Sequence, residues 1–567
     1  MMNDILEICR KQPEMLLFLS LAAGYYIGKL RFKGFSLGST ASVLLVALAL
    51  GQIPGVKVPA LLKTVSFALF VFCIGYSVGP QFFGALKKQG LSYIWVALVV
   101  AVAALVTVLG LGKLFSFDPG TTAGLLAGAL TTSSAIGTAE GAIAHLPALS
   151  DAAKVAMETN VAVAYGITYV FGTVGGILMF SLLPRIIGID LKAEAKKLEE
   201  SYSGGEDDLD KSPELFLWTR QLSLRAYLVK NEKVVGKTLK DVEGMFEHLA
   251  YVEAVRRDGQ PLAPQPDLLV RPGDILVIGS SFRTNMIAAS DLIGPEQDIK
   301  GMVDIVGEVM DVCVLNREAV GKTIAELAKR EESHGLFLRR ITRQGNAVPI
   351  LPGTIIEHCD IIQLAGAKTD VERAVKRLGY PERPTDVTDM IVVGGGCVIG
   401  TLIGLLVVNV GGISITLGVG GGVLVSGLIF GWVRTLHPTY GQIPSASRWI
   451  LQNLGLNLFI ACVGLGAGSQ ALAALKTTGV SVFFAGVLLT IIPVLVGLIF
   501  AKVVLKLNPV LILGSLAGSR NITAALLVLQ EQAGSFTPVL GYAAPYAVAN
   551  VVLTIWGSLI VNIMHRL

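Results

Sequence analysis

The stretch Leu507–Gln532 reads LNPVLILGSLAGSRNITAALLVLQEQ and places a mostly polar sequence, Gly518 to Thr523, between two apolar runs. An arginine inside a hydrophobic segment is costly unless a polar or anionic group meets it. Arg520 lies at the centre of this sequence, between Ser519 and Asn521. We interpret the stretch as a broken or re-entrant membrane segment whose polar tip lies near the bilayer midplane.

A second copy of the pattern, FDPGTTAGLLAGALTTSSAIGTAEGAI, occupies Phe117–Ile143 and has an uncharged tip, Thr131-Thr132-Ser133-Ser134. The two copies align with a constant shift of 390 residues: Pro119 with Pro509, Gly124 with Gly514, and Leu126-Ala127-Gly128 with Leu516-Ala517-Gly518. We expect the two tips to meet and the rest of the chain to carry them.

The composition is that of a membrane protein with a soluble insert. Of 567 residues, 53% are hydrophobic and only 16% are charged, whereas a soluble protein has about 25% charged residues. The charges crowd into residues 189–389, and the remaining chain has repeated apolar runs long enough to span a bilayer. The net charge of +4 gives no reason to expect a nucleic-acid partner. The scattered cysteines show no metal-type spacing, so we expect no metal and no cofactor.

The first half predicts five spans and the polar-tipped segment. The expected spans are 15–30, 37–53, 61–82, 91–113 and 161–183. Basic loops stay cytoplasmic, and three such loops fall on one side if the N-terminus is outside and segment 117–146 does not cross: Lys29/Arg31/Lys33, Lys87/Lys88 and Arg185/Lys192. We therefore expect a hairpin that enters from the outer face.

The second half repeats the first. Leu62–Lys87 aligns with Leu451–Lys476, and Tyr165, Thr173 and Gly176 align with Tyr546, Thr554 and Gly557. The basic residues of this half are cytoplasmic if it begins inside and ends outside: Arg434, Arg448, Lys502 and Lys506. The halves therefore have opposite orientations, which is the organisation of secondary transporters with alternating access.

We expect five regions: a first transmembrane repeat at 1–188, a charged linker at 189–212, two small α/β modules at 213–296 and 297–382, and a second transmembrane repeat at 383–567. Each module contains a Gly-Lys-Thr triplet, ending at Thr238 and Thr323. Neither triplet has the upstream glycine of a phosphate loop, so both are interpreted as turns. The first module has a Pro-Gly-Asp turn ending at Asp274, where the second has His358-Cys359-Asp360.

Arg520 is the main candidate for substrate binding, because a guanidinium group forms a bidentate fork suited to a carboxylate. The neighbouring side chains of Ser519, Asn521 and Thr523 can add hydrogen bonds. Three hydroxyls of the other tip either contact the substrate or cap the break in the helix: Thr132, Ser133 and Ser134. The nearest acids, Glu140 and Glu158, fit either a substrate ammonium group or the outer interface. No nucleophile–base pair or catalytic residue is indicated, so we expect no enzyme.

The two modules resemble the TrkA C-terminal (RCK C-terminal) domain. With two inverted hydrophobic halves and the Gly-Ser-Arg-Asn tip, the whole chain is identified as a member of the aspartate:alanine exchanger family. The resemblance implies an electrogenic bacterial antiporter that imports anionic aspartate against neutral alanine. Importing one negative charge against 100 mV costs about 2.3 kcal/mol, which an aspartate gradient can supply. Another dicarboxylate or acidic amino acid, such as succinate or glutamate, stays open as the substrate.

The expected protein is a homodimer in the bacterial inner membrane with both termini outside, cytoplasmic TrkA-C-like modules that take a small regulatory ligand, and an elevator-type mechanism. A TrkA-regulated ion transporter is the alternative from another class. It needs a carbonyl-lined filter or paired intramembrane aspartates, which the sequence lacks, and Arg520 repels cations. A sensor that uses its spans only as an anchor would have no use for duplicated polar tips.

Overall fold

The computed structural model describes residues 7, 12–32, 35–36, 38–56, 58–85, 91–147, 149–203, 223–246, 250–262, 264–280, 289–297, 307–330, 333, 336–343, 346–382, 387–410, 413–416, 418–436 and 441–567. The predictions for Lys33, Lys87, Lys88 and the linker residues 204–212 lie outside these ranges. The chain forms two compact units, Met1–Ala195 with Pro384–Leu567, and Lys196–Arg383.

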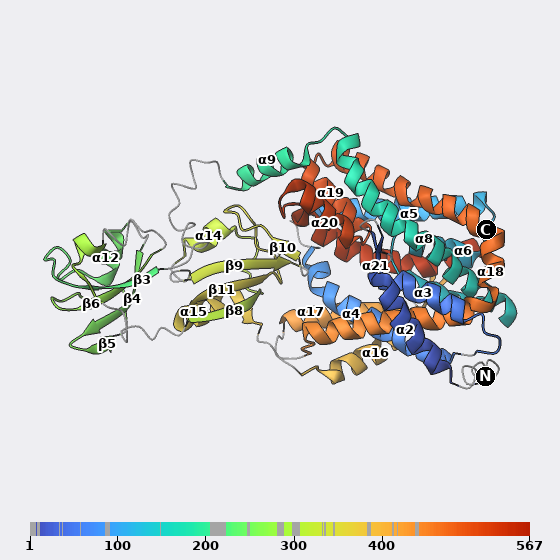
Figure 1. Cartoon of the computed structure of the whole chain (residues 1–567), viewed down its shortest axis with the longest axis horizontal. Coiled ribbons are helices and arrows are strands. Elements are labelled where there is room, and N and C mark those ends of the chain that lie inside the picture. The colour runs from blue at the N-terminus through green and yellow to red at the C-terminus, as the bar shows by residue number, and fades with distance from the viewer. Residues whose placement is uncertain are drawn as a thin grey trace. The chain divides into compact units, whose positions relative to one another are not determined.

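The first unit is helical (Figure 1). Its first half contains α2 (Pro13–Lys29), α3 (Ser39–Leu50), α4 (Ala60–Ala85), α5 (Leu91–Leu114), α6 (Pro119–Ala129), α7 (Ser134–Ala144) and α8 (Asp151–Ile186). Its second half contains α16 (Met390–Gly404), strands β13 (Val407–Val410) and β14 (Ile413–Thr416), α17 (Gly418–Leu436), α18 (Ser445–Ile499), the π-helix η2 (Phe500–Val504), α19 (Pro509–Ser519), α20 (Thr523–Ala533) and α21 (Pro538–Met564). A two-residue strand pair, β1 (Arg31–Phe32) and β2 (Phe35–Ser36), joins α2 to α3.

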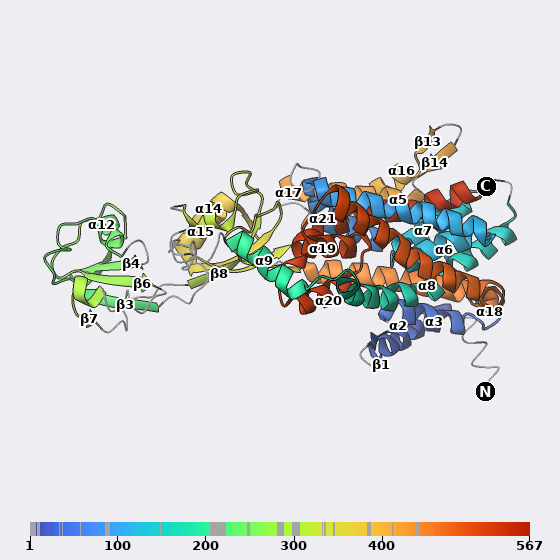
Figure 2. The ribbon, with the colours of Figure 1, turned by 90° about the horizontal axis from the view of Figure 1, so that it is seen from above.

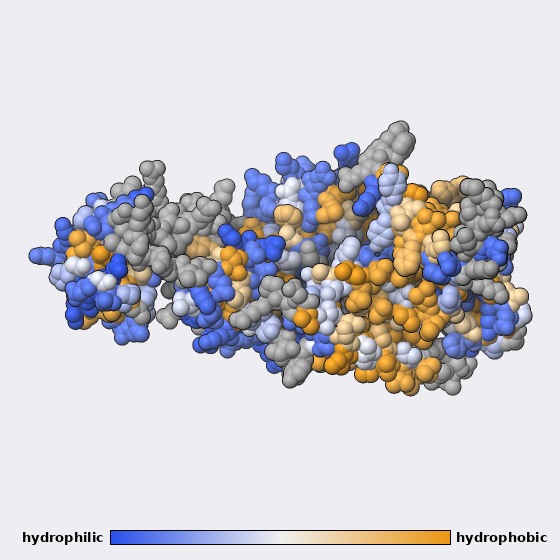
Figure 3. All heavy atoms as spheres, turned by 60° about the horizontal axis from the view of Figure 1, so that its bottom comes forward, coloured by the Kyte–Doolittle hydropathy of each residue, from blue (hydrophilic) through white to orange (hydrophobic). Residues whose placement is uncertain are grey.

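Seven helical segments in the described part of the chain are long and apolar enough to cross a membrane: 60–84, 91–114, 151–186, 418–436, 445–477, 479–504 and 538–564. Segment 445–477 lies within α18, and segment 479–504 comprises the end of α18 and η2. Figure 3 shows that one face of the helical unit is largely apolar.

The second predicted span, 37–53, is shorter than expected. The helix α3 has 12 residues, about 18 Å at 1.5 Å per residue. It begins after Gly38, whose φ of 78° is not helical, and a turn follows from Gly51. Gly51 itself keeps right-handed helical angles, φ −67° and ψ −8°, and the helix gives way to the turn that leads to Pro54.

The segment with the uncharged tip is a re-entrant hairpin. Its first helix, α6, runs parallel to α8, because Gly120, Gly124 and Gly128 lie against Met157, Val161 and Tyr165 in that order. Its second helix, α7, returns to the start of α8. There Lys154 Nζ donates to the carbonyl oxygen of Ala144, the last residue of α7, at 2.8 Å. Both ends of the segment therefore lie at the same end of the bundle, as predicted.

The segment with Arg520 is the inverted counterpart. Its first helix, α19, runs parallel to α21, with Gly514 against Pro538 and Gly518 against Tyr542. Near the end of α20, Gln532 Nε2 donates to the carbonyl oxygen of Ser181 at 3.0 Å, close to the end of α8. This hairpin therefore opens where α8 ends, and the other opens where α8 begins (Figure 2). The two halves are inverted, as the sequence predicted.

The described residues of the second unit form two small antiparallel sheets, each of five strands. The first has the order β5-β4-β6-β3-β7, from β3 (Ser223–Leu228), β4 (Ala250–Arg257), β5 (Gln260–Leu262), β6 (Ile275–Ser280) and β7 (Glu296–Gln297), with helix α12 (Leu239–Gly244). The second has the order β10-β9-β11-β8-β12, from β8 (Gly307–Val314), β9 (Leu336–Arg343), β10 (Asn346–Val348), β11 (Ile361–Ala367) and β12 (Gly379–Pro381), with α14 (Ile324–Ala328) and α15 (Lys368–Leu378). Helix α9 (Leu191–Ser203) precedes them.

The Gly-Lys-Thr triplets begin short helices. The hydroxyls of Thr238 and Thr323 accept hydrogen bonds from the backbone N–H groups of Asp241 and Glu326, and each forms a capping box. This role satisfies the free N–H groups of a helix start. This capping role explains why each triplet has a threonine, without a role in phosphate binding.

Close helix packing around the hairpins predicts that Gly518 tolerates no side chain. A Cβ there would lie 2.3 Å from the carbonyl oxygen of Tyr542, whereas a Cβ at Gly394 in α16 would have no neighbour within 4 Å. We expect Gly518→Ala to destabilise the protein by about 1–3 kcal/mol and Gly394→Ala to be neutral or stabilising. Thermal unfolding in detergent measures both variants. Equal midpoints would contradict this packing.

Candidate functional site

The two hairpin tips have the same backbone geometry. The residues that follow the first helix of each hairpin, Leu130 and Arg520, have φ, ψ angles of −99°, 8° and −108°, 7°. The next residues, Thr131 and Asn521, take positive φ angles of 53° and 55°. Asparagine adopts this left-handed conformation readily, but a β-branched threonine does so only under strain. Strained backbone of this kind is concentrated at functional sites.

The tips bind each other directly. Thr131 Oγ1 donates to the carbonyl oxygen of Arg520 at 3.3 Å, and Asn521 Nδ2 donates to Thr132 Oγ1 at 3.2 Å. The guanidinium group of Arg520 reaches across, and its Nη2 donates to the carbonyl oxygen of Ala129 at 2.5 Å. Three hydrogen bonds therefore join two segments that are almost 400 residues apart in the chain.

Arg520 is fully buried, with 0% of the residue exposed. Its Nε and Nη1 have no hydrogen-bond partner among the described residues, and no described carboxylate forms an ion pair with it. Burying an ion without an opposite charge costs several kcal/mol. The arrangement therefore leaves two donors of a buried cation available to an anion.

The helix ends at the tips add positive potential. Helix α7 begins at Ser134 and helix α20 begins at Thr523, directly after the two tips. Each helix N-terminus carries unsatisfied N–H groups and the positive end of the helix dipole. Two such ends beside Arg520 favour a bound anion.

The predicted hydroxyls contact the protein rather than an open site. Ser133 Oγ lies 2.7 Å from Tyr165 Oη, and Thr523 Oγ1 lies 3.0 Å from Tyr542 Oη. Ser134 Oγ and Thr554 Oγ1 are 2.5 Å apart, and Ser519 Oγ donates to the carbonyl oxygen of Ser515 at 2.7 Å. The structure thus brings Arg520, Asn521 and Thr132 together, and places the four hydroxyls around them as supports for the tips.

Sequence alignment paired Tyr165 with Tyr546, but the contacts pair it with Tyr542. Tyr165 and Tyr542 each contact the same position of their hairpins, Ser133 and Thr523. Each also packs on a second tyrosine one helical turn later, with ring centroids 5.0 and 5.2 Å apart. The alignment was wrong by four residues, one helical turn, because both tyrosines of each pair fit an apolar helix.

Sequence reasoning missed the groups that hold Arg520. The carbonyl oxygen of Ala129 accepts its hydrogen bond, and a backbone acceptor has no sequence signal. Gly176 of α8 leaves room for it, since a Cβ there would lie 3.3 Å from Arg520 Nη1 and 2.7 Å from Ile522 Cδ1.

Glu140 and Glu158 lie away from the tips and share a cation. Lys63 Nζ is 3.1 Å from Glu140 Oε2 and 2.9 Å from Glu158 Oε2. Lys63 stands near the start of α4 and was not singled out by the sequence, because it lies far from both acids in the chain. This group sits where the first hairpin opens.

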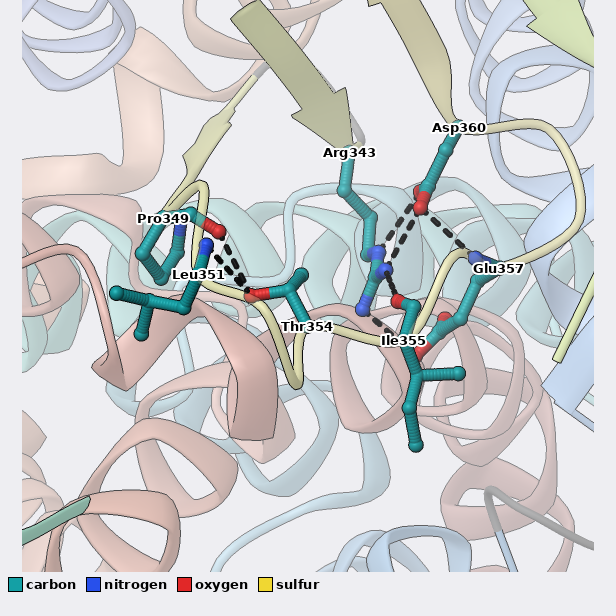
Figure 4. A network of polar contacts seen from close by, with 7 residues as sticks. All are labelled: Arg343, Pro349, Leu351, Thr354, Ile355, Glu357 and Asp360. Carbon is teal, nitrogen blue, oxygen red and sulfur yellow. Dashed lines mark hydrogen bonds and ion pairs between the residues drawn. The ribbon is translucent and has the colours of Figure 1, made fainter. Parts of the chain in front are cut away.

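In each small module, a paired arginine and aspartate fix the turn before a central strand. In the second module, Arg343 Nε and Nη2 donate to the two carboxylate oxygens of Asp360 at 2.8 and 2.7 Å, and Nη1 donates to Glu357 Oε1 at 2.6 Å (Figure 4). Although burial disfavours its charge, the carboxylates of Asp360 and Glu357 raise the pKa of Arg343 above its usual value.

The first module repeats the pair. Arg257 Nε and Nη2 each donate to Asp274 at 2.8 Å. Cys359 takes a φ of 68° where Gly273 has 84°. The second turn therefore keeps its shape although it lost its glycine.

Comparisons with known proteins agree with this architecture. The family described as "Predicted Permease Membrane Region" matches residues 16–185 and 392–562, and the TrkA-C domain matches 224–287 and 313–379. An uncharacterized transporter of Bradyrhizobium diazoefficiens is 40% identical over 99% of both chains. One from Shewanella oneidensis is 37% identical over 99% of this chain and all of its own length. No solved structure matches.

The chain belongs to this permease family. The matches to the membrane region and to two TrkA-C domains confirm the resemblance to the aspartate:alanine exchanger family. The permease carries its hairpins inside the two matched membrane regions, and the two matched TrkA-C domains contain strands β4, β5 and β6 of the first five-stranded sheet and β9, β10 and β11 of the second.

The position of Gly176 predicts a way to displace Arg520 without removing its charge. In the permease, Gly176→Val would push against Arg520 and Ile522, whereas Gly110→Val in α5 would meet no atom within 4 Å of its Cβ. We expect Gly176→Val to reduce transport at least tenfold and Gly110→Val to preserve it. Initial rates of substrate uptake into proteoliposomes measure both, and normal transport by Gly176→Val would contradict the placement.

The Arg343–Asp360 pair predicts local stability of the second module. Arg343→Met leaves Asp360 buried at 1% exposure without its partner, which costs about 3–5 kcal/mol. Arg340→Met on the same strand removes an exposed ion pair of 3.7 Å to Asp311, worth about 0–1 kcal/mol. Hydrogen exchange of β9 and β11 in the full-length permease, followed by mass spectrometry, should accelerate strongly only in Arg343→Met. Similar exchange in both variants would show that the pair does not hold the module.

Proposed function

We propose that this permease is a secondary active antiporter that exchanges aspartate for alanine across the bacterial inner membrane. The observation that supports it best is the buried Arg520, which lies where the tips of two inverted hairpins meet and keeps two guanidinium donors without partners among the described residues. Inverted repeats with discontinuous helices at the midplane are the organisation of alternating-access transporters.

The chemistry of the tip fits a carboxylate. A carboxylate accepts two parallel hydrogen bonds from Nη2 together with either Nε or Nη1, so it can bind in a bidentate manner when it replaces the Ala129 carbonyl oxygen at Nη2. The bound anion would also remove the electrostatic cost of the buried cation. Asn521, whose Oδ1 has no partner among the described residues, can meet a donor of the same substrate.

The hydrogen bond from Arg520 to Ala129 suits exchange rather than uniport. In the empty carrier this bond joins the two tips. An incoming carboxylate competes for the same guanidinium group, so substrate binding and release would change the contact between the hairpins. A carrier that moves only with substrate bound at this contact performs antiport.

We further propose a homodimer with an elevator-type movement, termini outside and cytoplasmic TrkA-C domains that bind a small regulatory ligand. In this scheme the hairpins move with α8 and α21 against the spans near the start of each half. Cysteine cross-links that fix α7 to α17 should block exchange. Full exchange in a cross-linked protein would exclude the elevator movement.

Another dicarboxylate or acidic amino acid, such as succinate or glutamate, is the nearest alternative, because Arg520 selects for a carboxylate rather than for a particular carbon skeleton. A TrkA-regulated cation transporter is disfavoured, since a buried guanidinium group at the tips repels cations.

Exchange in proteoliposomes tests the proposal. We expect vesicles loaded with alanine to take up labelled aspartate faster when the interior is made positive. Arg520→Gln should lower this uptake at least about 30-fold, because losing one partner of a buried charge pair costs about 2 kcal/mol or more. Arg520→Lys should fall between, since lysine keeps the charge but not the fork.

Arg185→Gln is the matched control, because Arg185 is exposed at the end of α8. It should exchange like the wild type. Unchanged uptake in Arg520→Gln would remove the site assignment, and uptake of succinate without any amino-acid exchange would favour the dicarboxylate alternative.

A further inference from the structure

A separate cavity of about 230 Å³ lies at the opening of the first hairpin. Three charged side chains line it, Lys63 from α4, Glu140 from α7 and Glu158 from α8. Apolar side chains form much of the remaining wall, among them Val155, Val463 and Ala467. Glu140 follows Ser134, the first residue of α7, by six residues, about 9 Å along the helix.

The charges in the cavity do not balance. Lys63 Nζ lies 3.1 Å from Glu140 Oε2 and 2.9 Å from Glu158 Oε2, so one ammonium group faces two carboxylates. Glu140 is 5% exposed, and its Oε2 accepts no hydrogen bond of normal geometry from a described residue, although Lys63 is within ion-pair distance. A buried carboxylate without a full set of donors is costly.

The buried carboxylate of Glu140 lacks a hydrogen-bond donor, whereas Glu158 is 31% exposed and can be solvated. A divalent metal would need several oxygen ligands, and the described residues contain no cluster of three or more His, Cys, Asp or Glu able to hold one. The hydroxyl of Thr159 is already used, donating to the carbonyl oxygen of Val155 at 2.9 Å. A primary ammonium group has three donors and fits two carboxylates, and the apolar wall fits a small apolar group beside it.

We propose that this cavity is a second substrate site, which binds a small α-amino acid as its zwitterion. The ammonium group donates to the buried Glu140, Lys63 keeps its contact with Glu158 and binds the carboxylate of the ligand, and the apolar wall contacts the side chain. The inference deepens the proposed function, on which it rests, because it selects amino acids over simple dicarboxylates. It concerns residues away from Arg520, so the two sites are tested separately.

Isothermal titration calorimetry with the full-length protein in detergent tests this site, using L-alanine and propionate as probes. Propionate is alanine without its ammonium group. We expect alanine to bind at least tenfold more tightly than propionate, both in the wild type and in Arg520→Gln, which removes the proposed tip site.

Glu140→Gln should lower alanine affinity at least tenfold in both backgrounds. Glu531→Gln, which removes an exposed carboxylate on α20 of the other hairpin, should leave it unchanged. The side chain of Glu158 is 31% exposed, so Glu158→Gln disturbs the fold less. This variant provides the same test if Glu140→Gln fails to fold.

Alanine binding that survives in both Glu140→Gln and Glu158→Gln would overturn the second site. Equal affinities for alanine and propionate would also overturn it. So would sodium binding that depends on Glu140, seen as a binding heat with sodium chloride but not with choline chloride, if alanine does not compete with it. Failure of the proposed function looks different, because wild-type proteoliposomes would then show no aspartate:alanine exchange while alanine still bound in a Glu140-dependent manner.

Discussion

A guanidinium group buried without a counter-ion among the described residues is the constraint on which the architecture depends. Arg520 is fully buried, and one hydrogen bond to a backbone carbonyl does not offset the cost of burying its charge. A fold keeps such a group when a transient partner supplies the missing charge. The inverted hairpins, their paired helix ends and the close packing on α8 and α21 all serve to hold this group in place.

The repeat is symmetric in backbone and asymmetric in chemistry. Thr131 and Asn521 share the left-handed conformation, and Asp118 and Asn508 both cap the first helix of their hairpins. Arg520, however, corresponds to Leu130, so only one tip carries a charge. The first hairpin instead has its charges at its opening, where Glu140 and Glu158 meet Lys63. The two halves therefore share a backbone fold but differ in the charged side chains that they carry.

Much of this fold could be predicted from the sequence, because the constant shift between the two copies reports a repeated backbone. The hairpins, their opposite entry and the burial of Arg520 followed from that shift and from the basic loops. The length of α3 did not, since an apolar run does not show that the helix begins only after Gly38 and gives way to a turn after 12 residues. Lys63 was missed because only the folded chain brings α4 to α7 and α8, and the tyrosine pairing was wrong by one turn because both residues suit the same helix face. In the second module, Asp360 showed where the turn lies, but not that Cys359 would adopt the conformation of a glycine.

The most direct test of the central claim is a structure of the full-length protein determined with aspartate bound, at a resolution that shows the substrate. We expect a carboxylate between the two tips, within hydrogen-bond distance of Nη2 and of either Nε or Nη1 of Arg520, in place of the Ala129 carbonyl oxygen. Aspartate bound elsewhere, with the guanidinium group still contacting only the Ala129 carbonyl, would contradict it.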